Sequence, residues 1–333
     1  MQKLISVITP TYNNGHLIHR LLDSILQQTY NNIEMFVIDD GSTDNTKQII
    51  EGYFEKFKEK GYSFHYMYQN NQGQSAAINN GLKLVNGDYL IWPDADDWYA
   101  EPNSIEILAM TLNNTAGDVS CVRCLSFSIS EKTFNISHKT VYNEKQYLFE
   151  DCLLNQKKFF WGAGNYMIKT HIFFNEIEER TIYSEKEAGQ NWQILLPILY
   201  NHKCITIDKY LYNILDHSNS HSRKKLSYEK EMSKYKTYFN TVINTVNNIK
   251  SMSTKEKKLF TYKVKSKFSI LFFMTSFSFG KTENMRNIYK QMVAENLSIP
   301  KKTKFLYGLS FVPFGFTVHK ILRISKKSLK KIL

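Results

Sequence analysis

The first hundred residues alternate between two patterns of apolar side chains. Short, nearly continuous apolar runs are typical of strands that are covered on both faces of a sheet. Between these runs, apolar residues recur every three or four positions, which indicates helices with one buried side. The patterns predict strands over residues 4–9, 33–38, 64–68 and 89–92 and helices over residues 17–28, 49–57 and 73–85. Because strand and helix alternate in this way, we predict an α/β fold with a doubly wound parallel sheet and right-handed crossovers.

The pattern is less regular beyond residue 100. We expect strands over residues 119–129, 166–168 and 205–215 and helices over residues 103–113, 142–154 and 191–200, the last with a kink at Pro197. After residue 223 the chain becomes rich in lysine and aromatic residues, keeps a helical spacing and has no acidic clusters. We therefore predict two domains, residues 1–223 and residues 224–333.

Polar clusters follow three of the expected strands. They are residues 10–13 (Pro-Thr-Tyr-Asn), residues 39–42 (Asp-Asp-Gly-Ser) and residues 94–97 (Asp-Ala-Asp-Asp). The carboxyl ends of parallel strands lie at one edge of a sheet, and ligands of open α/β sheets bind there. We therefore expect the three clusters to form one site.

The third cluster places Asp94, Asp96 and Asp97 within four residues at the end of a strand. Carboxylates this close repel one another unless a cation lies among them, and hard divalent cations such as Mg²⁺ or Mn²⁺ prefer oxygen ligands. The alternative is a solvated acidic turn before the helix that begins near Asn103. The sequence has no G-x-G-x-x-G after the first strand and no G-x-x-x-x-G-K-S/T, so phosphate binding would depend on a metal and on side chains.

Basic charge is concentrated in one segment. The formal net charge is +12, and residues 301–333 contain nine Lys or Arg and no Asp or Glu. This asymmetry indicates a polyanionic partner, either anionic lipid or nucleic acid. The first apolar segment is too short for a signal peptide, and no apolar run reaches the length of a transmembrane helix. Cys121 and Cys124 are expected to be ordinary thiols, so we expect a reducing, cytoplasmic location.

Four segments in fixed order resemble the family-2 glycosyltransferases of the GT-A fold. They are residues 7–13 (Val-Ile-Thr-Pro-Thr-Tyr-Asn), 37–44 (Val-Ile-Asp-Asp-Gly-Ser-Thr-Asp), 71–79 (Asn-Gln-Gly-Gln-Ser-Ala-Ala-Ile-Asn) and 94–97. The resemblance extends over residues 1–222 and fades beyond. It implies a GT-A mixed sheet, with a nucleotide-binding half over residues 1–100 and an acceptor-binding half over residues 101–223. It also implies sugar transfer from a nucleotide-sugar, usually a UDP-sugar, with inversion at the anomeric carbon.

The resemblance also implies, position by position, a donor site. Tyr12 would stack on the base, and Asp40, with Asp39 beside it, would accept a hydrogen bond from uracil N3–H. Asp96 and Asp94 would ligate Mn²⁺ or Mg²⁺ across the two phosphates. The full expected set is Pro10, Thr11, Tyr12, Asn13, Asp39, Asp40, Gln74, Asp94, Ala95, Asp96, Asn191, His221 and Arg223. This chain departs from many relatives in having isoleucine instead of arginine at position 78, so one phosphate contact is absent.

The general base departs from the commonest family pattern, which is a Glu-Asp pair in the second half. Here Glu185 and Glu187 lie in a charged stretch, and either carboxylate is a candidate for taking the acceptor's proton. A solvated charged loop is the alternative. Residues 190–191 are expected to orient a substrate. His221 and Arg223 lie in a segment similar to the one that closes over the donor diphosphate in relatives, and a polar linker is the alternative there.

These features predict an inverting glycosyltransferase that uses a glycan acceptor, lipid-linked, in the synthesis of a bacterial surface polysaccharide such as capsule, O-antigen or exopolysaccharide. The apolar, lysine-flanked segments 268–279 and 305–324 would lie at the inner face of the cell membrane, with no nucleic acid as partner. Alternatively, these segments pack on the catalytic domain. The alternative functions are a metal-dependent nucleotidyltransferase, which would carry a glycine-rich loop after the first strand, and a basic nucleic-acid-binding protein, whose ligand the acidic cluster would repel.

Overall fold

The computed structural model describes residues 2–141, 144–155, 159, 161–216 and 226–312. The chain divides into two compact units. The first comprises Met1–Lys225 and Asn240–Lys257, and the second comprises Leu226–Phe239 and Lys258–Leu333. Helix α9 (Tyr228–Asn248) therefore contributes residues to both units. The functional division at residue 223 stays a prediction.

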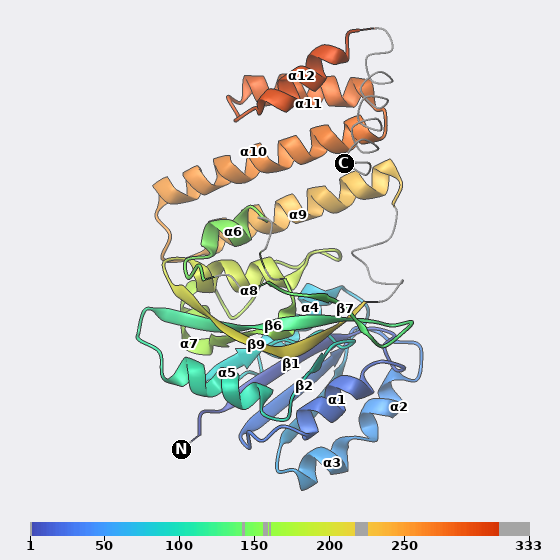
Figure 1. Ribbon diagram of the computed structural model, residues 1–333, viewed down its shortest axis with the longest axis vertical. Helices are drawn as coiled ribbons and strands as arrows, with labels where there is room; N and C mark the ends of the chain where they lie inside the picture. Colours follow the sequence, from blue (N-terminus) through green and yellow to red (C-terminus); the bar gives the residue numbers. More distant parts are fainter. Residues whose placement is uncertain (1, 142–143, 156–158, 160, 217–225, 313–333) are drawn as a thin grey trace, which may run out of the picture. The chain divides into compact units, whose positions relative to one another are not determined.

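The first unit is built around one mixed sheet (Figure 1). Its strand order is β3 (Ser63–Tyr68), β2 (Ile33–Asp39), β1 (Ile5–Thr11), β4 (Tyr89–Ile91), β8 (Tyr166–Lys169), β6 (Val119–Ser130), β9 (Lys203–Asp216) and β5 (Trp98–Tyr99), and β7 (Ile136–Lys139) pairs with β6. The first four strands of the chain run parallel, whereas β8 is antiparallel to both of its neighbours. The predicted α/β fold with a mixed sheet is confirmed: the parallel arrangement holds for β1 to β4 and again for β6 with β9, whereas the pairings of β5, β7 and β8 are antiparallel.

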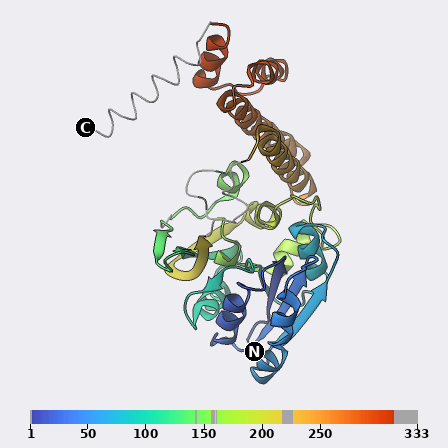
Figure 2. The ribbon, with the colours of Figure 1, turned by 90° about the vertical axis from the view of Figure 1, so that its right-hand side faces the viewer.

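Helices cover both faces of this sheet, as expected for a doubly wound fold. Odd-numbered residues of β1 and β2 pack in the main core with apolar residues from α1 (His19–Leu26), α2 (Thr46–Glu51), α3 (Phe54–Glu59) and α5 (Ser104–Asn113). Figure 1 shows these helices below the sheet and α8 (Gln190–Leu199) above it. The helix α4 (Gln74–Leu82) covers even-numbered residues, since its Gly81 lies against Ile8. In Figure 2 the strands of the first hundred residues lie to one side of the first unit, and β6 and β9 lie to the other.

Two predicted helices differ from the structure. The helix expected over residues 49–57 is interrupted at Gly52 and Tyr53, which separate α2 from α3. Glycine weakens a helix interior, and the Tyr53 hydroxyl donates to the Asp23 carboxylate, which ties this point to α1. The helix expected over residues 142–154 was wrong for residues 144–148, because only Phe149–Leu153 (α6) is helical. Residues 144–147 are exposed and so offer no apolar face to bury.

The rest of the first unit supports α8 and the end of the sheet. A 3₁₀ turn, η1 (Ala163–Asn165), leads into β8, which is followed by α7 (Thr170–Glu176). Pro197 lies inside α8, two residues before its end, and it lacks the N–H that would donate to the Gln193 carbonyl. Cys121 and Cys124 are free, buried thiols on β6.

The second unit contains the start of α9, most of α10 (Thr254–Ser278), α11 (Thr282–Ala294) and α12 (Lys301–Leu309). Its own small core is made of Phe273, Phe277, Met285 and Leu306. The predicted helical C-terminal region is confirmed, although residues 313–324 of the expected second apolar segment lie outside the described residues. Among the residues described, no helix is both long enough and apolar enough to cross a bilayer.

Candidate active site

The sheet brings the three polar clusters to one edge. Strands β1 and β2 pair in register from Ile5 with Ile33 to Thr11 with Asp39, and β4 pairs parallel to β1 on the other side. Their carboxyl ends therefore point the same way, and the segments after them start side by side. This pairing places residues 10–13, 39–42 and 94–97 at one edge of the sheet, as predicted from the sequence.

The loop after β1 is fastened to the loop after β2. The backbone N–H of Asn13 donates to Ser42 Oγ (2.8 Å), and Asn13 Oδ1 accepts from the backbone N–H of Thr43 (2.8 Å). Asn13 adopts a left-handed backbone conformation (φ 51°), which asparagine tolerates better than most residues. Pro10 and Thr11 are buried, whereas the Tyr12 side chain is 47% exposed. The loop thus presents one aromatic ring to solvent from a rigid base.

The two carboxylates at the end of β2 organise neighbouring loops. Asp39 accepts from the backbone N–H of Ser42 and from the hydroxyl of Tyr66, both at 2.8 Å. Asp40 accepts from Gln69 Nε2 (2.7 Å) and from the backbone N–H groups of residues 72 and 73 (2.8 Å each). Both carboxylates are buried. They draw the segment after β3 onto the end of β2, which closes one side of the site.

Asp94 meets the same segment from the other side. Its Oδ1 accepts from Gln74 Nε2 at 3.0 Å and from Gln190 Nε2 at 3.3 Å. Because Gly73 binds Asp40 and the next residue binds Asp94, the carboxylates after β2 and β4 meet at the N-terminus of α4. The positive end of a helix dipole is a favourable place for negative charge.

Burial and mutual repulsion strongly perturb this acidic cluster. Burial, together with the charge of Asp96, raises the pKa of Asp94 to about 7. Burial first, and then the charges of Asp96 and Asp94, raise the pKa of Asp97 well above its ordinary value. Asp97 Oδ1 accepts from the backbone N–H of Leu215 (2.9 Å), so this carboxylate is directed into the sheet. A divalent cation beside Asp94 and Asp96 would offset their repulsion.

The residues present fit a metal that shares its coordination with a substrate. Within the described ranges, no three His, Cys, Asp or Glu side chains converge on one point that could hold a metal ion. With Asp97 turned inward, Asp94 and Asp96 remain as donors. A pair of carboxylates is the donor set that Mg²⁺ uses where diphosphate oxygens and waters complete its shell. A metal ion held by this pair would therefore need phosphate oxygens and waters to complete its coordination shell.

The candidate bases lie on a loop beside the same helix end. Glu185 is half-buried and accepts from the Tyr183 hydroxyl at 3.0 Å, whereas Glu187 is exposed. The backbone of Lys186 covers Gly73, which has φ 96° and no room for a Cβ atom. The loop over residues 183–189 is thus in contact with the residue that binds Asp40.

The expected substrate-orienting residue, Asn191, is engaged within the protein. Its Oδ1 accepts from Trp92 Nε1 and its Nδ2 donates to the Trp161 carbonyl, both at 2.9 Å. Its contact with a substrate stays a prediction. His221 and Arg223 lie outside the described residues. Ala95 is buried between the two acidic donors in the chain.

Gln69 and Gly73 are absent from the expected donor set although both hold Asp40. Gln69 directly follows β3, which is a fourth strand end at the same edge. That position was the signal available in the sequence. Gly73 has no such signal, because the backbone that leaves no room for a Cβ atom there is that of Lys186, more than a hundred residues away in the chain.

Solved structures share this GT-A architecture. The chain superposes on residues 1–349 of Staphylococcus aureus TarS in complex with UDP-GlcNAc, with a TM-score of 0.64 and 17% identity over 94% of this chain and 87% of that one. A mannosyltransferase from Pyrobaculum calidifontis, solved with GDP-Man and Mn²⁺, gives a TM-score of 0.50 at 12% identity, covering 96% of this chain and 88% of that one. At these identities the likeness establishes the fold.

Residues 6–178 match the sequence model of glycosyl transferase family 2, and the chain belongs to this family. A glycosyltransferase of Streptococcus pneumoniae, GlyA, is 38% identical over 130 residues, which are 39% of this chain and 18% of that protein. An uncharacterized glycosyltransferase of Rickettsia typhi is 36% identical over 133 residues, which are 40% of this chain and 39% of that protein. The chain thus matches well under half the length of these curated relatives.

Proposed function

We propose that this protein transfers a sugar from a UDP-sugar donor to a glycan acceptor with inversion at the anomeric carbon. The observation that carries the proposal is the meeting of Asp40 and Asp94 at Gly73 and Gln74, at the sheet edge where the loop with the exposed Tyr12 also begins. An aromatic platform, a buried carboxylate and a cation-binding carboxylate pair are the parts that a base, a ribose and a diphosphate require. TarS, which shares the fold, has been solved with UDP-GlcNAc and with UDP.

In this proposal each cluster has one task. Tyr12 stacks on uracil while residues 10, 11 and 13 close the base pocket, and Asp40, with Asp39 beside it, accepts from uracil N3–H. Asp94 and Asp96, with Gln74 orienting the first, would hold Mn²⁺ or Mg²⁺ near the diphosphate. When bound, the cation neutralises charge that gathers on the departing UDP. His221 and Arg223 would close over the same phosphates.

The acceptor side needs a carboxylate on the face of the sugar opposite UDP. Glu185 is our preferred base because it is half-buried and oriented by the Tyr183 hydroxyl, and Glu187 is the second candidate. The base accepts the proton of the acceptor hydroxyl as the new glycosidic bond forms. Asn191 supports the wall of this half by joining residues 92 and 161.

A donor screen tests the proposal. UDP release is measured across a panel of nucleotide-sugars with Mn²⁺, with EDTA, and after Mn²⁺ is added back. We expect turnover of at least one UDP-sugar, loss of turnover with EDTA and loss in Asp96→Ala. Asp88→Ala is the matched control, because Asp88 precedes the same strand and pairs with Lys3 at its opposite end (2.8 Å). Full activity of Asp96→Ala, or calorimetry that detects no UDP binding with Mn²⁺, would refute the proposal.

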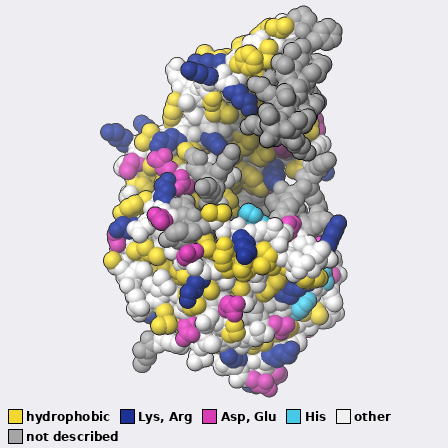
Figure 3. All heavy atoms as spheres, in the orientation of Figure 1, with side chains coloured by type: hydrophobic (Ala, Val, Ile, Leu, Met, Phe, Trp, Pro, Cys, Tyr) yellow, Lys and Arg dark blue, Asp and Glu magenta, His cyan; other side chains and the backbone are white. Residues whose placement is uncertain are grey.

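We further propose that the acceptor is lipid-linked, in the synthesis of a bacterial surface polysaccharide, and that the protein works at the inner face of the membrane. Helix α12 supports this, because it exposes Lys301, Lys302 and Lys304 together with Phe305. Figure 3 shows basic and hydrophobic side chains next to each other over α11 and α12. Lysines and apolar side chains on one surface suit an anionic lipid headgroup layer.

Vesicle co-sedimentation tests the membrane proposal. The protein should pellet with phosphatidylglycerol vesicles and not with phosphatidylcholine vesicles. Replacing the three α12 lysines by glutamate should weaken binding at least a hundredfold, since each basic residue contributes about 1 kcal/mol at an anionic surface and each glutamate is repelled by it. Lys132→Glu, an exposed lysine of the first unit, is the control. Equal binding of the triple variant and the control would refute a role for α12.

A further inference from the structure

The loop over residues 183–189, which carries both candidate bases, is tied at its start to α4. Asn79 Nδ2 donates to the carbonyl of Ile182 (2.9 Å), and the N–H of Ile182 donates to Asn79 Oδ1 (2.8 Å). One side-chain amide thus satisfies both backbone groups of a single residue, as a neighbouring strand would. A pairing with two bonds fixes the orientation of the chain as well as its position.

The same loop is tied at its end to the first turn of α4. Ser75 Oγ donates to the carbonyl of Ala188 (2.5 Å), and Gln193 Nε2 donates to Ser75 Oγ and to the carbonyl of Gly189 (3.2 Å each). Ser75 and Gln193 are almost fully buried, with 0% and 2% of their surface exposed. Hydrogen bonds shielded from water in this way are costly to break singly, because a partner is left buried and unpaired.

Between these two ties the loop rests on Gly73. A Cβ atom at Gly73 would collide with the carbonyl of Lys186, and the turn is closed by the N–H of Ala188 donating to the carbonyl of Glu185 (2.8 Å). Helix α4 therefore contacts the loop through residues 73, 75 and 79. The first of these also binds Asp40, and Gln74 binds Asp94. One helix end thus joins the candidate donor site to the candidate base loop.

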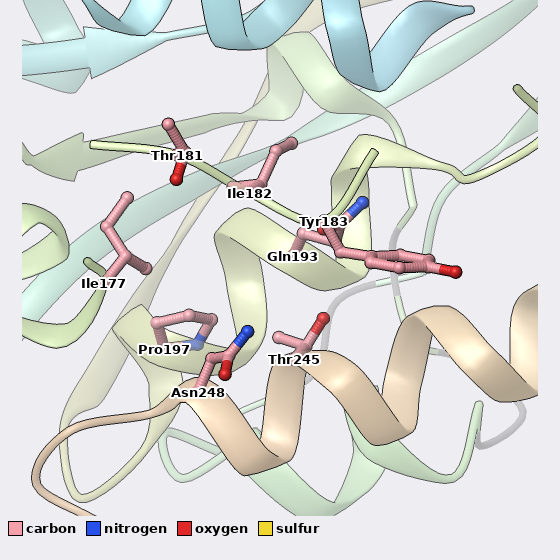
Figure 4. A pocket seen from close by; sticks show the side chains of 8 residues that line it. All are labelled: Ile177, Thr181, Ile182, Tyr183, Gln193, Pro197, Thr245 and Asn248. Carbon is pink, nitrogen blue, oxygen red and sulfur yellow. The ribbon is translucent and has the colours of Figure 1, made fainter. Parts of the chain in front are cut away.

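The packing behind the start of the loop leaves a small gap. Figure 4 shows a pocket behind the start of the loop, between Ile182 and Tyr183 on one side, Gln193 and Pro197 of α8, and Thr245 of α9. All of these residues belong to the first unit. The loop is therefore held by its hydrogen bonds to α4 together with the burial of Ile182 and Ala188.

We propose that Asn79, Ser75 and Gln193 are positioning residues that set the place of Glu185 relative to Asp94. None of them is needed to bind the nucleotide; they act through the backbone of residues 182–189. The inference rests on the proposed function, because a positioned base matters only if the loop faces a donor sugar. A displacement of about 1 Å in such a group can lower a rate about a hundredfold.

Hydrogen exchange of the full-length protein tests the ties without any substrate. In Asn79→Ala the peptide containing Ile182 should lose protection, and in Ser75→Ala the peptide containing Ala188 should do so. Lys83→Ala is the matched control, because Lys83 follows the same helix and is exposed. Unchanged exchange of residues 182–189 in Asn79→Ala would overturn the proposal. If the variant of the buried Ser75 fails to fold, the exchange of residues 182–189 in Asn79→Ala still decides the question.

Kinetics then separate positioning from general damage. With whichever donor is turned over, Asn79→Ala should lower kcat about 10- to 100-fold while UDP affinity with Mn²⁺ changes less than about twofold. Asn79→Asp keeps the acceptor for the Ile182 N–H and loses the donor, so its kcat should be intermediate. An equal loss of UDP affinity and kcat would refute positioning. If the wild-type protein binds no UDP, the proposed function fails, whereas the exchange result still decides whether the loop is tied.

Discussion

The donor side and the acceptor side of the candidate site are held in different ways. On the donor side, the backbone register of β1, β2 and β4 places residues 10–13, 39–42 and 94–97 at one edge. On the acceptor side, a few side chains of α4 and α8 hold residues 183–189. Because of this difference, substitutions on the two sides should have different effects on stability, UDP binding and turnover. Donor-side loops share many supports, whereas the base loop depends on individual hydrogen bonds.

The largest effect should come from the base itself. Glu185→Gln keeps the shape of the side chain but cannot accept a proton, so kcat should fall about 10²- to 10⁴-fold with UDP affinity unchanged. Glu187→Gln changes an exposed side chain of the same loop and should lower kcat far less. The two variants are compared by UDP release and by UDP titration. If Glu187→Gln shows the large loss instead, the roles of the two carboxylates are exchanged.

The second effect should come from Gly73, which belongs to both sides. Alanine there would have to adopt φ 96° and would collide with the Lys186 carbonyl, so the loop must move away from α4. We expect a loss of about 1–3 kcal/mol in the free energy of unfolding and loss of both UDP binding and turnover. Gly61→Ala has a similar φ of 79° with open space around it, and it controls for backbone strain alone. Equal behaviour of the two variants in denaturant melts would contradict the contact.

This contrast also explains how much the sequence could predict. The strand ends of the first hundred residues follow from apolar runs, and their convergence follows from a general property of parallel sheets. The ties at Ser75 and Asn79 could not be predicted in that way, because their partners, Ala188 and Ile182, lie more than a hundred residues away in the chain. The helix expected over residues 142–154 is present at Phe149–Leu153 and was wrong at residues 144–148, where exposed residues give no face to bury.

The third effect should come from Asp40, which separates structural from nucleotide-binding roles on the donor side. In Asp40→Asn, one amide hydrogen must face either Gln69 Nε2 or one of two backbone N–H groups, because all three donate to the native carboxylate. An unpaired buried donor costs about 1–3 kcal/mol, so the melting temperature and UDP affinity should both fall. Thermal unfolding and UDP calorimetry measure the two losses. Lost affinity without lost stability would mean that Asp40 serves the ligand alone.

The smallest effect on stability should come from Tyr12, which is the most exposed of the expected donor-site residues that lie after β1 and β2. Its ring is 47% exposed, so Tyr12→Ala should leave the melting temperature unchanged. Stacking of a base on an aromatic ring contributes about 1–3 kcal/mol, so UDP affinity should fall about 10- to 100-fold. Tyr12→Phe keeps the ring and should bind UDP as the wild type does, which distinguishes stacking from hydrogen bonding by the hydroxyl. If the alanine variant binds UDP normally, the base does not stack on Tyr12 and lies elsewhere along the edge.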